Sequence, residues 1–443
     1  MAPEVLPLLM LGAFVALLLV GVPVAYAAAA SGLVFGFIGF GDSLFNLLPA
    51  RIYGVATDPS LLALPMFVFM GTMLEKSRLG HDMLEAMGHL AGRVPGGMAV
   101  GIVLFGVIMG ATTGIVGATI VLLGMIALPT LLKYRYDHGL AAGTICASGT
   151  LGQIIPPSLV LLLLAEIMNE SVGTLFAAAL MPGLLLAGLY VVYILVYAWR
   201  HPEKAPPIPA DERAAVSRGQ LWLRLAKGVL PALLLVLAVL GSIMGGVAAP
   251  TEAAAIGALG SIVIVAASGK LSVKVLRDTC RDTLITSAVI FFVIMTAQAF
   301  SLAFRGLGGE RLIQDLFALI PGGTFADILF FMAVLFVAGV LLEWAEISYI
   351  VLPLFLPYFV AQGVDMVWLA ALICINLQTS FLTPPVGWSL FFFRSVAPAV
   401  VQTREIYRGV WPFIGLQLGA VLVVMAFPSI ATWLPTAMGW MNR

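Results

Sequence analysis

Apolar segments long enough to cross a lipid bilayer follow one another along almost the whole chain, and residues 200–219 form the only long polar stretch. One transmembrane helix needs about 20 apolar residues, so these segments supply on the order of a dozen spans or half-spans. Only 10% of the side chains are charged, whereas a soluble domain carries about 25% to cover its core. The sequence therefore predicts an all-α polytopic membrane protein.

Charge and motif content exclude other classes of function. The 22 basic and 22 acidic residues cancel, and no basic run suggests a nucleic-acid partner. No HExxH, GxSxG or GxxxxGK[ST] motif occurs, so neither a hydrolase site nor a nucleotide-binding loop is expected. We therefore expect no enzyme, and transport would be driven by a gradient or by a separate energising protein.

The two halves of the chain repeat the same landmarks. Each half contains a Pro-Gly-Gly sequence, then an apolar stretch with a glycine at its centre, then a Pro-Pro pair. The corresponding positions are 95–97, Gly110 and 156–157 in the first half, and 321–323, Gly339 and 384–385 in the second. Interrupted hydrophobic segments at corresponding positions of two halves are typical of a secondary transporter's binding site. We therefore predict two inverted-topology repeats.

The apolar stretches at about 97–132 and 325–360 are each too long for one ordinary span. Each can form two antiparallel arms of about 15 residues, at 1.5 Å of rise per residue. The first turn would lie at 110–119, where glycine permits a tight backbone and threonine hydroxyls offer oxygen ligands, and the second at 339–346. The alternative is a straight helix whose small residues pack on a neighbour, but the repetition favours a re-entrant helical hairpin in each half.

The Pro-Pro pairs break two expected helices, at about 138–168 and 367–393. Two prolines remove two backbone donors and free the carbonyls of the preceding turn, which then need protein, water or an ion as a partner. Such carbonyls, facing a hairpin turn, can form an oxygen cage for Na⁺. We therefore place one Na⁺ between the Thr113 turn and residues 152–156, and a second between the Gly339 turn and residues 380–383. A packing kink is the alternative at each pair.

Glu343 and Glu346 are the most informative charges, because ionisable groups within apolar segments are costly and usually functional. Three positions apart, they share one face if a helix persists there. They could help to bind a cation, exchange a proton or cap backbone amides at a hairpin turn. A structural or cation-supporting role is favoured, because no histidine or lysine lies nearby in the sequence.

The polar stretch separates the two halves, and its basic residues favour the cytoplasmic side by the positive-inside rule. We expect scaffold helices at 1–60 and 171–199, first-repeat transport elements at 61–170, a polar linker at 200–228, scaffold or arm helices at 229–284, second-repeat transport elements at 285–400 and a C-terminal helix at 401–443.

Four segments carry a resemblance to a known family. They are residues 64–71 (LPMFVFMG), 147–158 (ASGTLGQIIPPS), 249–258 (APTEAAAIGA) and 382–387 (LTPPVG). They resemble the large membrane subunit of the tripartite ATP-independent periplasmic (TRAP) transporters. The resemblance implies an elevator-type transporter of the bacterial inner membrane that carries an organic acid together with Na⁺. It also implies two partners, a periplasmic substrate-binding protein and a small four-helix membrane subunit.

The resemblance further implies which residues form two Na⁺ sites. The first comprises Thr113, Val116, Gly152, Ile155 and Pro157, and the second comprises Gly339, Ser380, Thr383 and Val386, with Gly110, Glu343 and Glu346 in support. The sequence departs from the family pattern at Ile115 and Val116, where the family's turns have serine, at Ser380, where glycine is usual, and at Glu343, where aspartate is common. The first site would then rest on backbone carbonyls alone or be weakened.

A self-sufficient ion-coupled carrier or channel without a binding protein is the competing hypothesis. A channel would need a continuous polar pore, whereas paired broken helices favour an occluded site. Neighbouring genes for a secreted binding protein and for a four-span protein would support the tripartite system.

Overall fold

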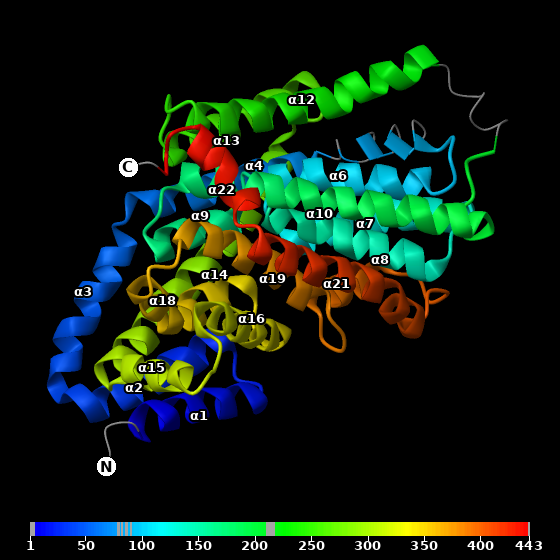
Figure 1. Ribbon diagram of the computed structural model, residues 1–443. Coiled ribbons are helices and arrows are strands. Elements are labelled where there is room, and N and C mark those ends of the chain that lie inside the picture. Colours follow the sequence, from blue (N-terminus) through cyan, green and yellow to red (C-terminus); the bar gives the residue numbers. More distant parts are fainter. Residues whose placement is uncertain are drawn as a thin grey trace.

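The computed structural model describes residues 5–77, 80, 83–84, 87–88, 91–209 and 218–441, which form helices joined by turns (Figure 1). Nine helices in this part of the chain are long and apolar enough to cross a membrane. The predicted all-helical polytopic class is therefore confirmed. Residues 210–217 of the expected linker lie outside the described residues.

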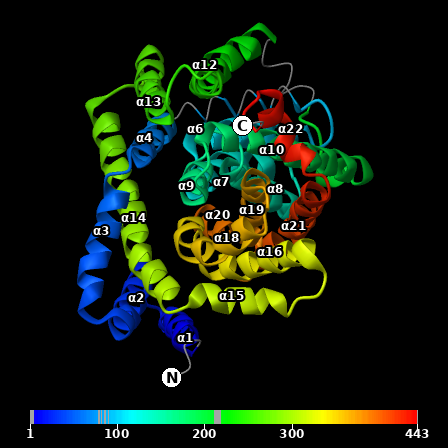
Figure 2. The same ribbon diagram turned by 60° about the vertical axis from the view of Figure 1, so that its left-hand side comes forward.

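One group of helices, here called the frame, lies beside a rounder bundle and wraps part of it (Figure 2). The frame comprises α1 (Val5–Leu19), α2 (Val24–Phe40), α3 (Leu44–Ala56), α4 (Ala63–Lys76), α12 (Arg218–Met244), α13 (Pro250–Ala267) and α14 (Val273–Gly306). Helix α14 packs on α2, α3 and α4, and α13 packs on α4 and α12. The amphipathic helix α15 (Gly309–Ala318) leaves the frame and packs on the bundle through α18.

The bundle, here called the body, contains both hairpins and both broken helices. Its first-half helices are α6 (Gly97–Thr113), α7 (Val116–Lys133), α8 (His138–Thr150), α9 (Leu159–Met168) and α10 (Val172–Arg200). Its second-half helices are α16 (Gly323–Leu341), α17 (Trp344–Glu346), α18 (Leu352–Ala361), α19 (Met366–Leu382), α20 (Trp388–Val396), α21 (Thr403–Ala426) and α22 (Ser429–Ala437). A π-helical turn, Ile347–Val351, joins α17 to α18.

Both broken helices begin in the same way. The Asp137 carboxylate accepts the Leu140 N–H at the start of α8, at 2.9 Å. The Asp365 carboxylate likewise accepts the Trp368 N–H at the start of α19, at 3.0 Å. An aspartate at this position satisfies a backbone donor that has no partner within the helix. The repeat therefore extends from the Pro-Pro pairs to the helix starts that position them.

The two repeats interlock within the body rather than standing side by side. Helix α7 of the first hairpin packs on α20, which follows the second Pro-Pro pair. A Cβ at Gly117 of α7 would come within 2.9 Å of the Phe392 ring on α20, so that ring would have to shift to admit a larger side chain. The first hairpin is thus completed by a helix from the far end of the chain.

Within the body, the backbones of α21 and α8 come into direct contact. A Cβ at Gly143 of α8 would lie 2.7 Å from the carbonyl carbon of Gly409 on α21. Nearby, the buried Gln417 amide of α21 donates to the Tyr190 hydroxyl of α10, at 2.7 Å. Close approach between small residues is a common way for membrane helices to associate, and here it ties α8, α10 and α21 together.

The packing of two helices and the continuity of a third differ from the division expected from the sequence. Helix α10, expected in the scaffold at 171–199, packs on α6, α9, α19 and α21 of the body. Helix α4, expected among the transport elements, packs mainly on α13 and α14 of the frame and also touches α6 of the body. The division expected between residues 284 and 285 falls inside α14, which is one continuous helix. Hydropathy marks apolar segments but does not identify the helix that each one contacts.

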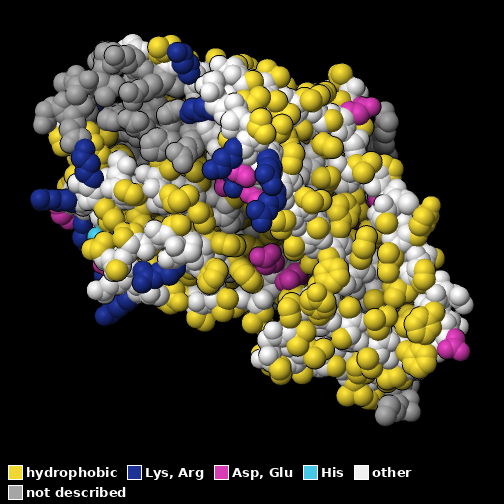
Figure 3. Space-filling model, turned by 180° about the vertical axis from the view of Figure 1, so that it is seen from behind, with side chains coloured by type: hydrophobic (Ala, Val, Ile, Leu, Met, Phe, Trp, Pro, Cys, Tyr) yellow, Lys and Arg dark blue, Asp and Glu magenta, His cyan; other side chains and the backbone are white. Residues whose placement is uncertain are grey.

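The outer surface has the composition that a bilayer requires. Figure 3 shows one face covered largely by hydrophobic side chains, with Lys and Arg gathered over one half of it. Large apolar side chains are exposed along both groups of helices, including Leu19 and Val263 of the frame and Val337 of the body. This surface is suited to lipid rather than water.

Candidate functional site

The tip of the first hairpin is a two-residue turn, tighter than the expected 110–119. Helix α6 ends at Thr113, Gly114 adopts a left-handed conformation with φ +60°, and α7 begins at Val116 after the extended Ile115. Glycine reaches a positive φ without a steric penalty. The tip abuts the frame, because a Cβ at Gly71 of α4 would approach the Thr113 carbonyl oxygen to 2.8 Å.

Threonine hydroxyls cluster inside this tip. The Thr113 hydroxyl donates to the Met109 carbonyl at 2.9 Å and contacts the Thr119 hydroxyl at 2.9 Å. The Thr119 hydroxyl also reaches the Ile115 carbonyl at 3.0 Å. A hydroxyl that gives its proton to a carbonyl keeps lone pairs for another partner. Thr113 is buried and so can offer an oxygen ligand within the protein, whereas the buried Val116 can offer only its carbonyl.

The first broken helix passes directly against the hairpin. A Cβ at Gly110 would lie 2.6 Å from the Cα of Gly152, so the two backbones touch. Pro156 and Pro157 cannot donate, which frees the carbonyls of Gly152 and Gln153, four residues earlier. The Ser158 hydroxyl donates to the Gln153 carbonyl at 2.6 Å. Among the described residues, none donates to the Gly152 carbonyl, which leaves that oxygen as a candidate ligand.

The tip of the second hairpin has no glycine at the turn. Helix α16 ends at Leu341, Leu342 is extended, and α17 begins after Glu343. The Glu346 carboxylate accepts the Glu343 backbone N–H at 2.8 Å. Three roles were open to this pair, and the structure shows one of them for Glu346, which caps a backbone amide. Both carboxylates are half-buried.

The second broken helix repeats the contact of the first. A Cβ at Gly339 would come within 2.6 Å of the Ser380 Cβ, so this hairpin also touches its broken helix. The Ser380 hydroxyl donates to the Leu377 carbonyl at 2.8 Å, and the Thr383 hydroxyl donates to the Thr379 carbonyl at 2.7 Å. Both side chains are buried, whereas 46% of the Val386 surface is exposed in the loop that follows.

Sequence reasoning missed the serines that stabilise both breaks. In the second repeat, the Ser389 hydroxyl donates to the Phe381 carbonyl at 2.6 Å, as Ser158 does to Gln153. Each accepting carbonyl lies four residues before the second proline of its pair, so its helical donor is missing. The peptide bond within each Pro-Pro pair is cis. A serine shortly after each pair was the signal that could have identified these residues.

A polar contact between the repeats was also not anticipated. The Tyr349 hydroxyl of the π-helical turn donates to the Glu166 carboxylate of α9 at 2.6 Å. A second side chain, Asn376 of α19, donates to the Met332 carbonyl of α16 at 2.7 Å. These bonds tie the second hairpin to both broken helices, and neither can be found from spacing in the sequence.

The donor set suits Na⁺ rather than a transition metal. Among the described residues, no cluster of three or more His, Cys, Asp or Glu side chains could hold a metal ion. The hairpin tips and breaks instead offer hydroxyl and carbonyl oxygens at Thr113, Gly152, Ser380 and Thr383, which are hard neutral donors. Ile155 and Pro157 are buried in the first break and can contribute only carbonyls.

Two helix breaks, each touched by a helical hairpin within an apolar bundle, define a polytopic membrane protein of the secondary-transporter class. Residues 11–430 match the family described as the tripartite ATP-independent periplasmic transporter, DctM component, and the chain belongs to this family. It is thus a transporter permease rather than an enzyme, and a multi-pass protein of the bacterial inner membrane.

Individual relatives and a solved structure agree over nearly the full length. The chain is 28% identical to the C4-dicarboxylate TRAP transporter large permease protein of Vibrio cholerae, over 98% of each chain. It is 26% identical to the ectoine/5-hydroxyectoine TRAP transporter large permease protein of Ruegeria pomeroyi, over 95% of this chain and 96% of that one. The crystal structure of the Alcanivorax borkumensis YdaH transporter matches with a TM-score of 0.61 over 99% of both chains, at 16% identity, which is a likeness of fold.

Proposed function

We propose that this permease imports an organic acid anion together with Na⁺, after a periplasmic substrate-binding protein delivers the anion. The observation that carries the proposal is the doubled contact between a hairpin and a broken helix, Gly110 on Gly152 and Gly339 on Ser380. Each contact gathers freed carbonyls and hydroxyls in a buried place. Neutral oxygens in such a place can bind Na⁺ without a charged ligand, and a cation there would help to hold an anion.

The first Na⁺ would be held by Thr113, Val116, Gly152, Ile155 and Pro157, and the second by Gly339, Ser380, Thr383 and Val386. Gly110, Glu343 and Glu346 would support the backbone of these sites. The second site has two buried hydroxyls beside its break, so we expect it to contribute more to Na⁺ affinity. Bound Na⁺ would supply positive charge for the substrate anion.

The movement we propose is that of an elevator, in which the body slides against the frame. Support comes from packing, since the interlocked repeats, α10 and α21 form one bundle while α14 and its neighbours form another group. Alternating access in inverted-repeat transporters is largely rigid-body movement of one group against the other. We therefore assign α10 to the moving body and α4 to the frame, and a small four-helix membrane subunit would cover the frame.

The orientation we propose places the basic end in the cytoplasm. Lys133, Arg135, Arg200 and Lys204 lie where α7 and α10 end, and basic residues favour the cytoplasmic side. The opposite end, where α9 ends and α10 begins, would then face the periplasm and receive the substrate from the binding protein.

The experiment is an uptake assay in proteoliposomes that hold the permease with its partner proteins. A binding screen on the periplasmic protein first identifies the organic acid, and uptake is then followed with Na⁺ or choline outside. We expect uptake only with an inward Na⁺ gradient and only with the binding protein present. Equal uptake in choline would refute Na⁺ coupling, and full uptake without the binding protein would favour a self-sufficient carrier or channel.

A further inference from the structure

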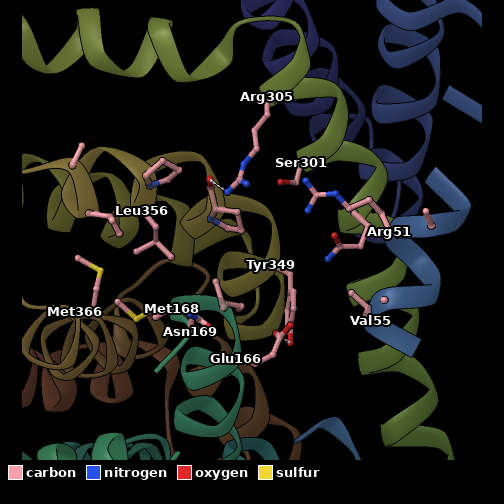
Figure 4. A pocket seen from close by; sticks show the side chains of 18 residues that line it. Arg51, Val55, Glu166, Met168, Asn169, Ser301, Arg305, Tyr349, Leu356 and Met366 are labelled. Carbon is pink, nitrogen blue, oxygen red and sulfur yellow. Dashed lines mark hydrogen bonds between the residues drawn. The ribbon is translucent and has the colours of Figure 1, made fainter. Parts of the chain in front are cut away.

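A cavity of about 700 Å³ lies between the frame and the body, beside the π-helical turn that follows the second hairpin tip, and none of the residues proposed for the Na⁺ sites lines it. The frame contributes α3 and α14 to its wall, and the body contributes the end of α9, the π-helical turn and α18 (Figure 4). Pockets of 300–1,000 Å³ are the usual size for small-molecule sites. In the proposed orientation this cavity lies in the periplasmic half, and we call it the frame–body cavity.

The two walls of the frame–body cavity differ in charge. Arg51 of α3 and Arg305 of α14 extend into it from the frame, and Tyr349 and Glu166 face them from the body (Figure 4). The Glu166 carboxylate already accepts the Tyr349 hydroxyl at 2.6 Å. No described residue makes a hydrogen bond or an ion pair with Arg51. The frame wall therefore presents a guanidinium with all its donors free to a partly enclosed space, which favours an anion.

Arg305 donates a hydrogen bond to a backbone carbonyl, and a carboxylate could replace that carbonyl as its partner. Its Nη2 donates to the Pro353 carbonyl of α18 at 3.2 Å, and its Nε lies 3.7 Å from the Glu310 carboxylate. The Pro353 carbonyl can accept this bond because the residue four positions later, Pro357, has no N–H to give it. A carboxylate carries a full negative charge and can accept two parallel N–H bonds from one guanidinium, whereas the Pro353 carbonyl is neutral and accepts one.

We propose that the frame–body cavity binds a carboxylate group of the transported solute through Arg51 and Arg305, with Arg305 giving up the Pro353 carbonyl. The proposal rests on the proposed function only in taking the solute to be an organic anion. Binding here would precede transfer to the sites at the breaks. It would also release α18 of the body from α14 of the frame, since the Arg305 bond crosses the boundary between them.

The test is equilibrium binding of succinate, lactate and acetate to the purified full-length chain in lipid-free detergent, with choline replacing Na⁺. We expect at least one of these carboxylates to bind, and Arg51→Gln or Arg305→Gln to weaken that binding about tenfold or more. Arg311→Gln removes the same charge from the exposed face of α15, outside the cavity, and should bind as the wild type does. Equal binding by all four proteins, or none by any, would overturn the proposal.

A second variant tests whether the carboxylate replaces the Pro353 carbonyl as the partner of Arg305. It should raise the affinity for the carboxylate, whereas the arginine variants lower it. Pro357→Ala restores an N–H that can satisfy the Pro353 carbonyl, so Arg305 should become freer and the carboxylate should bind severalfold more tightly. Unchanged or weaker carboxylate binding would refute the idea that Arg305 exchanges the Pro353 carbonyl for the carboxylate. The same titration in nanodiscs of phosphatidylcholine, with or without phosphatidylglycerol, distinguishes solute from lipid. Loss of all carboxylate binding in phosphatidylglycerol would assign the arginines to a lipid headgroup and refute the solute site.

These measurements are independent of the uptake assay. Arginine-dependent binding without any Na⁺-driven uptake would leave the cavity site standing and refute the proposed function. Na⁺-driven uptake with unaltered carboxylate binding in both arginine variants would refute the cavity site and leave the proposed function standing.

Discussion

Thr383 offers the sharpest test of the second Na⁺ site, because its hydroxyl has both a structural and a proposed ligating role. The Thr383 backbone N–H bonds to the Ser380 carbonyl at 3.2 Å, so the Thr379 carbonyl loses its helical donor. The Thr383 hydroxyl donates a hydrogen bond to the Thr379 carbonyl instead, at 2.7 Å. Thr383→Val keeps the shape, removes the possible ligand and leaves the Thr379 carbonyl without this donor.

Loss of one ligand to the cation costs about 1–3 kcal/mol, so half-maximal uptake should need about five- to 150-fold more Na⁺. The unpartnered carbonyl costs a similar amount of folding stability, which thermal unfolding of the same preparation would register. The assay is uptake in proteoliposomes against Na⁺ concentration, with choline holding the ionic strength constant. Thr383→Ser keeps the hydroxyl and should stay close to the wild type.

A control tests whether loss of a threonine hydroxyl alone alters the Na⁺ requirement. The Thr296 hydroxyl donates to the Phe292 carbonyl at 2.9 Å within the continuous helix α14 of the frame, away from the breaks, where that carbonyl keeps its helical donor. Thr296→Val should leave the Na⁺ requirement unchanged. If folded Thr383→Val also keeps the wild-type Na⁺ requirement, Thr383 is not a ligand and the site must be redrawn.

Three further predictions concern the body. Ser158→Ala should lower the unfolding free energy by about 1–3 kcal/mol because the Gln153 carbonyl loses its donor, whereas the exposed Ser395→Ala should change it little; equal thermal stability of the two would contradict this. Gly409→Ala should destabilise the α8–α21 contact by about 1–3 kcal/mol through overpacking, while Gly415→Ala on the same helix, with no atom nearby, should not. Cysteine pairs that join α7 to α20 should preserve transport, and pairs that join α14 to α18 should block it; the reverse pattern would favour local gating over an elevator.

The paired hairpins could be predicted because local rules determine them. The length of an apolar run separates one span from two arms, and consecutive prolines end a helix wherever they occur. The turns were less predictable: the first is confined to Gly114 and Ile115, since helical bonds persist up to Thr113 despite the glycines before it. Hydroxyl partners such as Ser158 and Ser389 depend on loop geometry that no spacing rule contains.

The sequence alone did not predict which helices belong to the frame and which to the body. The contact between Gly143 and Gly409 joins backbones far apart in the chain, and a glycine in an apolar run does not indicate what it faces. Arg51 and Arg305 are likewise remote in sequence and meet at one cavity only because α3 packs on α14. Such pairings are set by tertiary structure.

The interlocking of α7 with α20 also has a consequence for biogenesis. Phe392, which fills the space above Gly117, is synthesised roughly 275 residues later, a delay on the order of ten to fifty seconds at about 5–20 residues per second. Until then the groove along α7 faces lipid or a chaperone. A nascent chain truncated before α20 therefore lacks the helix that closes its own first hairpin, and the two halves, expressed separately, should mature only in the same cell.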